Sequence, residues 1–251
     1  MVPALGTKRH ALILFLPAIV NIAISWLIGF YVFAVVRPPY ERIGLEIVKH
    51  VMTYNFYWSV IQAVIAYYAV RAMGGLEWLK KQYSLEDIKD PVRDAALVVA
   101  LVVAAIGIIF AFQFLSAFAS GNPEEYFSFW RELMREVPLW SKAYLVAIAP
   151  FTAGFFEEIF WRGYGISKLE ETMSTKRALI LQAIAFGVWH GFSLHTVATA
   201  LIGLLFGYVY VKRRRLLLLS TAHVITDIIG FTFAVLTCFA PLAVRENYSA
   251  G

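Results

Sequence analysis

The sequence predicts an all-α fold, a polytopic transmembrane helical bundle of seven or eight spans. Of the 251 residues, 60% are hydrophobic and only 16% are charged. A soluble domain of this length would be about half apolar and a quarter charged. The apolar residues form blocks of roughly 17 to 26 residues, which is the length that crosses a bilayer as a helix. The single cysteine, Cys238, excludes an intrachain disulfide.

The expected spans follow one another along the chain and are separated by charged or helix-breaking residues. The first six are expected at 11–36, 51–70, 92–119, 141–164, 178–192 and 196–211. The last apolar stretch, 216–244, is long enough for one tilted helix or for two shorter helices broken near Gly230. The count is therefore seven or eight, depending on that stretch.

Two helix starts carry the same signal, a capping Asp or Asn followed by Pro, at Asp90 and Asn122. Ser84 is a further cap candidate, with Asp87 three residues later. Between 124 and 137, apolar residues recur on one helical face while charges fill the other. This pattern predicts an amphipathic helix that lies in the membrane interface.

The net charge of +5 raises the question of a nucleic-acid partner. No cluster alternates basic and aromatic residues as a nucleic-acid surface would, so we expect membrane lipid and no nucleic acid around this chain. Basic residues of membrane proteins mark cytoplasmic loops. With the N-terminus inside, the inner segments hold 14 Lys and Arg residues and the outer loops hold six. The inner segments are 1–10, 71–93, 168–177 and 212–215.

This bias predicts an integral membrane protein with a cytoplasmic N-terminus. It also places the end of the fourth span that bears Glu157 toward the cytoplasm. A site built around Glu157 is therefore expected to open toward the cytoplasm.

Three of the later spans carry polar side chains that are costly in hydrocarbon. A charged side chain there costs at least about 2.5–3.5 kcal/mol, and such residues usually face the bundle interior. Helix positions four apart differ by only about 40°, so residues paired in this way share a face. The pairs are Glu158 with Arg162, Phe186 with His190, and His223 with Asp227, and Glu157 lies about a quarter-turn from Glu158.

The economical arrangement is for these three faces to converge on one polar cavity. Glu158 would pair with Arg162, which lowers the cost of both ions. Glu157 would stay free beside one or two imidazoles, and a carboxylate next to a histidine in a partly dry site activates water well. A second histidine offers an N–H donor to a developing oxyanion. Such a set suffices to hydrolyse an amide without a nucleophilic side chain.

These motifs resemble those of the CAAX protease and bacteriocin-processing family. The matching residues are Glu157-Glu158-x-x-x-Arg162, Phe186-x-x-x-His190 and His223-x-x-x-Asp227. That family comprises intramembrane proteases of the type that trims the last three residues from prenylated CAAX proteins. The resemblance covers about 141–230, and it implies an intramembrane endopeptidase that acts near the C-terminus of a protein or peptide, prenylated or not.

The resemblance also implies roles for individual residues. Glu157 and His190 would activate water, while His223 and Asp227 would line the oxyanion site. The family often has Asn at the position of Asp227, and an ionised Asp accepts hydrogen bonds but donates none. Asp227 would therefore be protonated, orient His223 as a charged donor, or bind a metal. The supporting residues are Glu158, Arg162 and Phe186.

A divalent ion such as zinc is the alternative cofactor, because descriptions of the family include both metal-dependent and metal-free glutamate mechanisms. The ligands of such an ion would be Glu157, His190, His223 and Asp227. No HExxH spacing is present, and we favour the metal-free mechanism.

Two functions other than a peptidase stay open. One is a non-enzymatic membrane scaffold of the same family, of the bacteriocin-immunity type; the other is a proton-coupled transporter, since intramembrane acids and histidines also form relays.

The resemblance divides one bundle into three parts. Residues 1–140 hold the N-terminal spans and the amphipathic connector, 141–230 form the catalytic core, and 231–251 hold the end of the last span and a tail.

Other residues receive simpler interpretations. His10, His50 and His195 are expected in loops at the membrane surface. Gly163 and Gly165 are expected to permit close helix approach, or a break at the mouth of the cavity.

Overall fold

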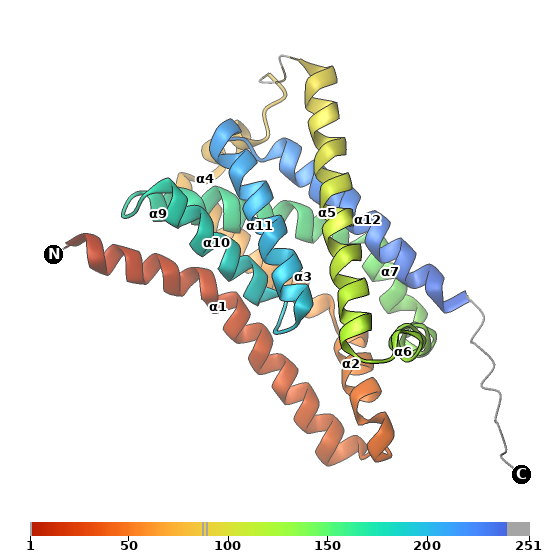
Figure 1. The fold of residues 1–251 in the computed structure, drawn as a ribbon. Helices are drawn as coiled ribbons and strands as arrows, with labels where there is room; N and C mark the ends of the chain where they lie inside the picture. The colour runs from red at the N-terminus through yellow and green to blue at the C-terminus, as the bar shows by residue number, and fades with distance from the viewer. Residues whose placement is uncertain (1, 87, 89, 240–251) are drawn as a thin grey trace, which may run out of the picture.

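The computed structural model describes residues 2–86, 88 and 90–239, and every regular element in that part of the chain is a helix (Figure 1). The predicted all-α class is therefore confirmed. The first half holds α1 (Val2–Tyr31), η1 (Val32–Val36), η2 (Tyr40–Arg42), α2 (Ile43–Thr53), α3 (Phe56–Met73), α4 (Gly75–Gln82), α5 (Pro91–Ala119) and α6 (Pro123–Glu136). The second half holds α7 (Leu139–Ala147), α8 (Ala149–Thr152), η3 (Ala153–Ile166), α9 (Ser167–Glu170), α10 (Thr175–Trp189), α11 (Leu194–Arg213), α12 (Leu217–Leu236) and η4 (Thr237–Phe239).

Within the described residues, five helical segments are long and apolar enough to cross a membrane, and one bent pair is a sixth candidate. The five are Lys8–Val36, Pro91–Ala119, Leu139–Glu170, Leu194–Arg213 and Leu217–Leu236. The bent pair joins α3 to α4 through a 103° turn at Gly74, whose φ of 114° suits glycine. Several apolar helices fit an integral membrane protein, but the predicted count of seven or eight spans is not confirmed.

Two helices explain why the count differs. α10 occupies the place of the expected span 178–192 but has 15 residues. It is therefore about 22 Å long, shorter than the hydrocarbon core of about 30 Å. α12 runs through Gly230 without a break, so the predicted alternative of two helices broken there is wrong. Residues 240–244 of that expected span lie outside the described part.

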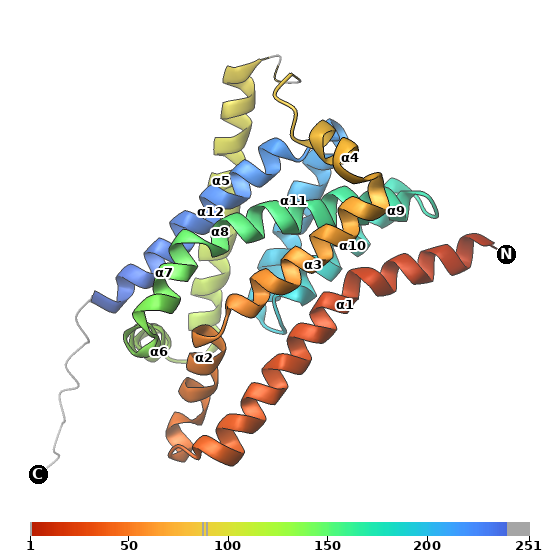
Figure 2. The ribbon, with the colours of Figure 1, turned by 180° about the vertical axis from the view of Figure 1, so that it is seen from behind.

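The centre of the bundle is η3, which contacts α3, α8, α9, α10, α11 and α12. Figure 2 shows this part of the chain crossing the middle of the bundle between α8 and α9. Its residues Phe160, Trp161 and Tyr164 belong to the main hydrophobic core, together with Trp189 of α10 and Phe206 of α11. Because 12 of its 14 residues are buried, any polar side chain on η3 must find its partners inside the protein.

The sequence predicts an ordinary helix over 141–164, whereas η3 is π-helical over 14 residues. π-Helical turns are rare, usually single, and frequent at functional sites. Close packing accompanies this winding. A Cβ atom at Gly154 would lie 2.4 Å from Val224 Cγ2, and one at Gly163 would lie 2.8 Å from the Trp78 ring. A Cβ at Gly165 would meet an α1 side chain at 2.9 Å, so the predicted close approach at Gly163 and Gly165 is confirmed.

α6 has the predicted amphipathic pattern, and protein covers part of its apolar face, while Trp130 on that face is 38% exposed. Leu133, Met134 and Val137 are buried and pack with Leu45 of α2 in a small core of their own. This contact accounts for part of the pattern, and the location of α6 in the membrane interface stays a prediction.

The two predicted helix caps are confirmed. The side chains of Asp90 and Asn122 accept hydrogen bonds from backbone N–H groups three residues later, at 3.0 and 3.2 Å. Ser84 starts no helix, and its hydroxyl accepts a bond from the N–H of Glu86 instead. Asp87 lies outside the described residues.

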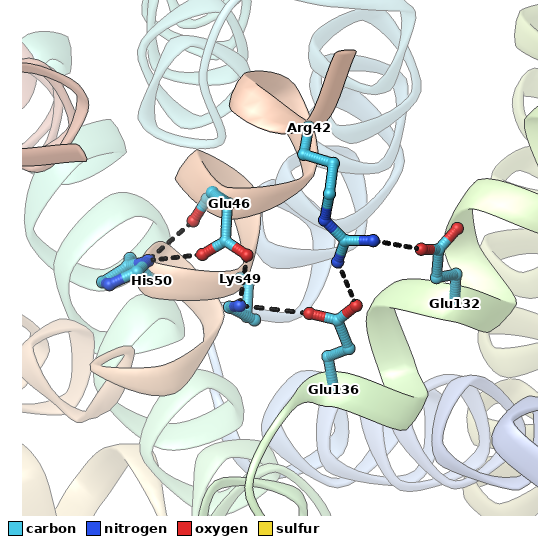
Figure 3. A network of polar contacts seen from close by, with 6 residues as sticks. All are labelled: Arg42, Glu46, Lys49, His50, Glu132 and Glu136. Atoms are coloured by element: carbon cyan, nitrogen blue, oxygen red, sulfur yellow. Dashed lines mark hydrogen bonds and ion pairs between the residues drawn. The ribbon is translucent and has the colours of Figure 1, made fainter. Parts of the chain in front are cut away.

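A polar network joins α2 and the turn before it to α6 at the edge of the bundle (Figure 3). Arg42 pairs with Glu132 at 3.1 Å and also with Glu136. Lys49 lies 2.5 Å from Glu46 and 3.1 Å from Glu136. Burial on its own raises the pKa of the Glu136 carboxyl, but hydrogen bonds from Arg42 and Lys49, together with their charges, outweigh it and lower the pKa. We call this set of side chains the α2–α6 network.

The segments predicted to face the cytoplasm gather at one end of the bundle. Arg213 pairs with Asp94 of α5 at 3.3 Å, and Arg214 pairs with Glu170 of α9 at 2.6 Å. Arg215 donates to a main-chain carbonyl of α4. In Figure 1, α4, α9 and the first turns of α5 lie in the upper half of the view. The basic segments thus share one end, while their cytoplasmic location stays a prediction.

The prediction that three histidines lie in loops is wrong. His10 belongs to α1, and its Nδ1 is 3.1 Å from the Tyr164 hydroxyl. His50 belongs to the last turn of α2 and bonds to a carbonyl of its own helix at 2.8 Å. His195 lies in the first turn of α11, with its ring 5.9 Å from the ring of His190.

Candidate active site

Three segments bring most of the predicted site residues together inside the bundle. η3 supplies Glu157, Glu158 and Arg162, the end of α10 supplies Phe186 and His190, and α12 supplies His223 and Asp227. The glutamates and Arg162 are at most 1% exposed, and His223 is 9% exposed. His190 and Asp227 are partly exposed. The glutamates therefore form the floor of the site, and His190 and Asp227 lie nearer its rim.

Glu158 and Arg162 form the predicted ion pair, with 3.0 Å between Arg162 Nη1 and Glu158 Oε1. The Arg162 guanidinium also lies over the Phe186 ring, 4.1 Å from its centroid. Such cation–π contacts gain strength when they are desolvated. Phe206 of α11 covers the same guanidinium at 5.6 Å. The arginine is thus held between a carboxylate and two aromatic rings.

Glu157 has two oxygens in different situations. Oε1 accepts hydrogen bonds from Gln62 Nε2 and from Trp189 Nε1, both at 2.7 Å. Oε2 is buried and has no hydrogen-bond partner among the described residues. It lies 3.9 Å from His223 Nε2. Because Oε1 is already occupied by two donors, Oε2 is the oxygen left to bind a water molecule.

His223 lies between three carboxylates. Its Nδ1 is 2.8 Å from Glu158 Oε1, and its Nε2 is 3.7 Å from Asp227 Oδ2 and 3.9 Å from Glu157 Oε2. An ionised carboxylate only accepts hydrogen bonds, so Nδ1 carries a proton in its contact with Glu158. Nε2 faces the space between Glu157 and Asp227. The predicted role of Asp227 in orienting His223 therefore has a geometric basis.

His190 belongs to an aromatic wall beside this cluster. Its ring lies 4.8 Å from the Phe186 ring and 6.0 Å from the Trp58 ring. Its Nδ1 bonds to the Phe186 carbonyl at 2.9 Å. Within the described part of the chain, no hydrogen bond or ion pair joins His190 to Glu157. Among the described residues, the histidine found near Glu157 is therefore His223, at 3.9 Å, and the expected pairing of Glu157 with His190 is not seen.

The predicted alternative metal site does not form. No group of three or more His, Cys, Asp or Glu side chains among the described residues is arranged to hold a metal ion. The four side chains expected as ligands were Glu157, His190, His223 and Asp227, and they do not form such a group. The residues present do not fit a metal centre, and we derive no step through one.

The sequence analysis missed two residues that bind Glu157. Gln62 comes from α3, far from the three motifs, and is 3% exposed. A single amide in an apolar helix is a usable signal, because polar side chains in such helices bond across to neighbours. Trp189 precedes His190 directly, and its N–H group needs a partner when it is buried. The N-terminal helices therefore contribute to the site.

An apolar groove of about 610 Å³ lies between α4 and η3, and its η3 residues flank the two glutamates in the sequence. Its η3 wall includes Phe155 and Phe156, the two residues before Glu157. Lys80 and the Tyr83 ring stand on its α4 side. The complete lining is Leu76, Leu79, Lys80, Tyr83, Phe155, Phe156 and Ile159.

Fold and site together define a helical membrane bundle with a polar cluster buried at its centre. Residues 138–229 match the family model described as "Type II CAAX prenyl endopeptidase Rce1-like". The match spans all three motifs, from Glu157 to Asp227, and confirms the resemblance predicted from them. It supports a membrane protease of that family. No curated protein and no solved structure matches the chain.

Proposed function

We propose that this protein is an intramembrane endopeptidase that hydrolyses a peptide bond near the C-terminus of a protein or peptide substrate. The observation that carries the proposal is the pair of unequal oxygens on Glu157. Oε1 is held by Gln62 and Trp189, and Oε2 is buried and unpartnered beside His223. A carboxylate kept in apolar surroundings at this cost is typical of a functional site.

In the first step, a water molecule bound at Glu157 Oε2 attacks the carbonyl carbon of the scissile bond and gives a proton to Oε2, while the π-electron pair of the carbonyl moves to its oxygen. His190 fixes the orientation of this water. Its Nδ1 donates to the Phe186 carbonyl, so in the neutral ring Nε2 keeps a lone pair that accepts from the water. Glu157 is the general base, and His190 assists it.

The N–H group at His223 Nε2 donates a hydrogen bond to the oxyanion that this attack creates. Asp227, 3.7 Å from Nε2, stabilises the positive charge of the imidazole. In the second step, Glu157 passes its proton to the amide nitrogen, the electron pair of the oxyanion re-forms the C=O bond, and the C–N bond breaks to give a carboxylic acid and an amine. Glu157 returns to its ionised form, so the cycle needs no side-chain nucleophile.

The apolar groove between α4 and η3 supports a substrate that carries a hydrocarbon group, such as a prenylated peptide. The groove lies next to Glu157 in the chain and is bordered by aromatic rings. Apolar walls of this kind favour an apolar ligand group.

We further propose that the site opens toward the cytoplasm, on the side where the N-terminus lies. The clustering of the basic segments at one end supports this orientation. A cysteine introduced at the exposed Lys176 should be labelled by a membrane-impermeant maleimide only after the cell membrane is opened. Labelling in intact cells would reverse the orientation.

The central experiment is cleavage of a prenylated reporter peptide by the purified full-length protein, compared with Glu157→Ala and with Glu132→Gln as a control. We expect Glu157→Ala to lose at least about 10²–10⁴-fold in turnover, the usual contribution of an acid–base group. Glu132, in the α2–α6 network, should be dispensable.

Turnover retained by Glu157→Ala would reject the assignment and favour a non-enzymatic scaffold. Dependence of a transport signal on a substrate gradient in proteoliposomes would favour a carrier. A parallel reaction with a chelator tests for a metal, and unchanged turnover is expected.

A further inference from the structure

A second groove lies between the first turns of α5 and the last turns of α11, away from the glutamates. It measures about 330 Å³ and is lined by Arg93, Leu97, Tyr208, Val209, Lys212 and Arg213. We call it the α5–α11 groove. α5 and α11 pack directly against each other, so the walls of the groove are regular helix.

The groove is polar at one end and apolar at the other. Arg93 lies in the first turn of α5, and Lys212 and Arg213 lie in the last turn of α11. Leu97 is one turn deeper along α5, and Val209 is nearly one turn deeper along α11. A phospholipid has the same order, with a charged headgroup outside and acyl chains inside.

The charges in the groove are incompletely balanced. Arg213 pairs with the buried Asp94 at 3.3 Å. Arg93 and Lys212 have no carboxylate partner among the described residues, and Lys212 Nζ lies over the Tyr208 ring at 5.6 Å. Asp90 is nearby, but its carboxylate caps the start of α5 by accepting the backbone N–H of Arg93. The groove therefore keeps an excess of positive charge at its polar end.

The next two arginines behave differently, which argues against a general basic tail. Arg214 donates to both oxygens of Glu170, at 2.6 and 2.8 Å. Arg215 turns to a carbonyl of α4. These two residues fasten the α11–α12 turn to neighbouring helices, whereas Arg93 and Lys212 line the groove.

We propose that the α5–α11 groove binds an anionic phospholipid. Arg93, Lys212 and Arg213 hold the headgroup phosphate, and an acyl chain lies along Leu97 and Val209. Anionic lipids attract basic residues near the membrane surface. The site is independent of the proposed peptidase activity, because none of its residues belongs to the glutamate cluster.

The test is the thermal unfolding midpoint of the purified full-length protein in detergent, titrated with phosphatidylglycerol, with phosphatidylcholine or with inorganic phosphate. A ligand that binds only the folded protein raises the midpoint. We expect a saturable rise with phosphatidylglycerol and a much smaller one with phosphatidylcholine. A rise of equal size with inorganic phosphate would overturn the assignment to lipid.

The variant Arg93→Gln/Lys212→Gln should weaken the apparent affinity for phosphatidylglycerol by about tenfold or more, since each basic group near an anionic lipid contributes about 1 kcal/mol. The matched control is Lys176→Gln/Arg177→Gln, which removes two exposed charges from the start of α10. The control should bind as the wild type does. Equal losses in both double variants would mean a diffuse charge effect and would overturn the site.

A third variant, Val209→Trp, fills the apolar end of the groove and leaves every charge in place. It should also weaken phosphatidylglycerol binding, and it keeps the test decisive if the double variant is unstable. Unchanged binding by Val209→Trp would show that no acyl chain occupies the groove.

Discussion

The molecule contains two clusters of ion pairs in opposite surroundings. At the centre, Glu158 and Arg162 pair with both side chains fully buried. At the edge, Arg42 and Glu132 of the α2–α6 network pair with side chains 41% and 46% exposed. The contacts have nearly equal lengths, 3.0 and 3.1 Å. The difference in burial, not in distance, decides what each cluster can do.

A buried pair gives up the hydration of both ions, and the attraction between them often does no more than offset that loss. An exposed pair loses little hydration and contributes only about 0–1 kcal/mol. The central cluster is therefore a poor source of stability and a suitable place for chemistry. The α2–α6 network fastens two helices, and its exposed ions keep most of their hydration.

The largest expected effect comes from breaking the central pair. Arg162→Met leaves Glu158 buried with only His223 as a charged partner, which should destabilise the protein by about 3–5 kcal/mol. Arg42→Met, the matched change at the edge, should cost no more than about 1 kcal/mol. Thermal midpoints of the purified proteins measure both. Equal shifts would remove the contrast between the two clusters.

The next effect concerns the residue that holds Glu157. Gln62→Leu removes one of two donors to Oε1, so turnover of the reporter peptide should fall about tenfold or more while KM changes little. Gln182→Leu is the control, because Gln182 is also buried but both of its polar atoms lack partners in the described part of the chain. Unchanged turnover in Gln62→Leu would mean that Glu157 is positioned by Trp189 alone.

The packing of η3 against α12 predicts a further difference between two glycines. Gly154→Ala would place a Cβ 2.4 Å from Val224 Cγ2 and 2.9 Å from the Val224 nitrogen. We expect a loss of about 1–3 kcal/mol in unfolding free energy. Gly107→Ala, in α5 with nothing within 4 Å of the added atom, should stabilise the helix by about 0.5–1 kcal/mol. An unchanged unfolding free energy in Gly154→Ala would show that η3 can shift away from α12.

The smallest effect belongs to the α2–α6 network. Glu136→Gln should lower the unfolding free energy by about 0.2–1 kcal/mol, and by less at high salt. The folded-state pKa of Glu136 lies below its usual value, so its contribution is present above the unfolded pKa of about 4.3 and is lost as pH falls through the folded pKa.

The midpoint difference between wild type and Glu136→Gln should therefore be constant near neutral pH and disappear in acid. Thermal scans across that range at low salt measure it. A difference that grows toward acid pH would contradict the assigned direction of the pKa shift.

The sequence alone determined the features that depend on a few neighbouring residues. The apolar blocks predicted the all-helical fold, and Asp90 and Asn122 predicted two helix starts. The four-residue spacing predicted the pair of Glu158 and Arg162. Such signals lie within one or two helical turns, so they can be recognised without knowing which helices pack against them.

Only the tertiary structure decided which partners meet across the bundle. Gln62 and Trp189 take one oxygen of Glu157, and His223 rather than His190 lies near the other. These contacts depend on the angle and depth at which η3 packs on α3, α10 and α12. Hydropathy gives the same value to a side chain that faces lipid and to one that faces another helix, so it contains no information about that packing.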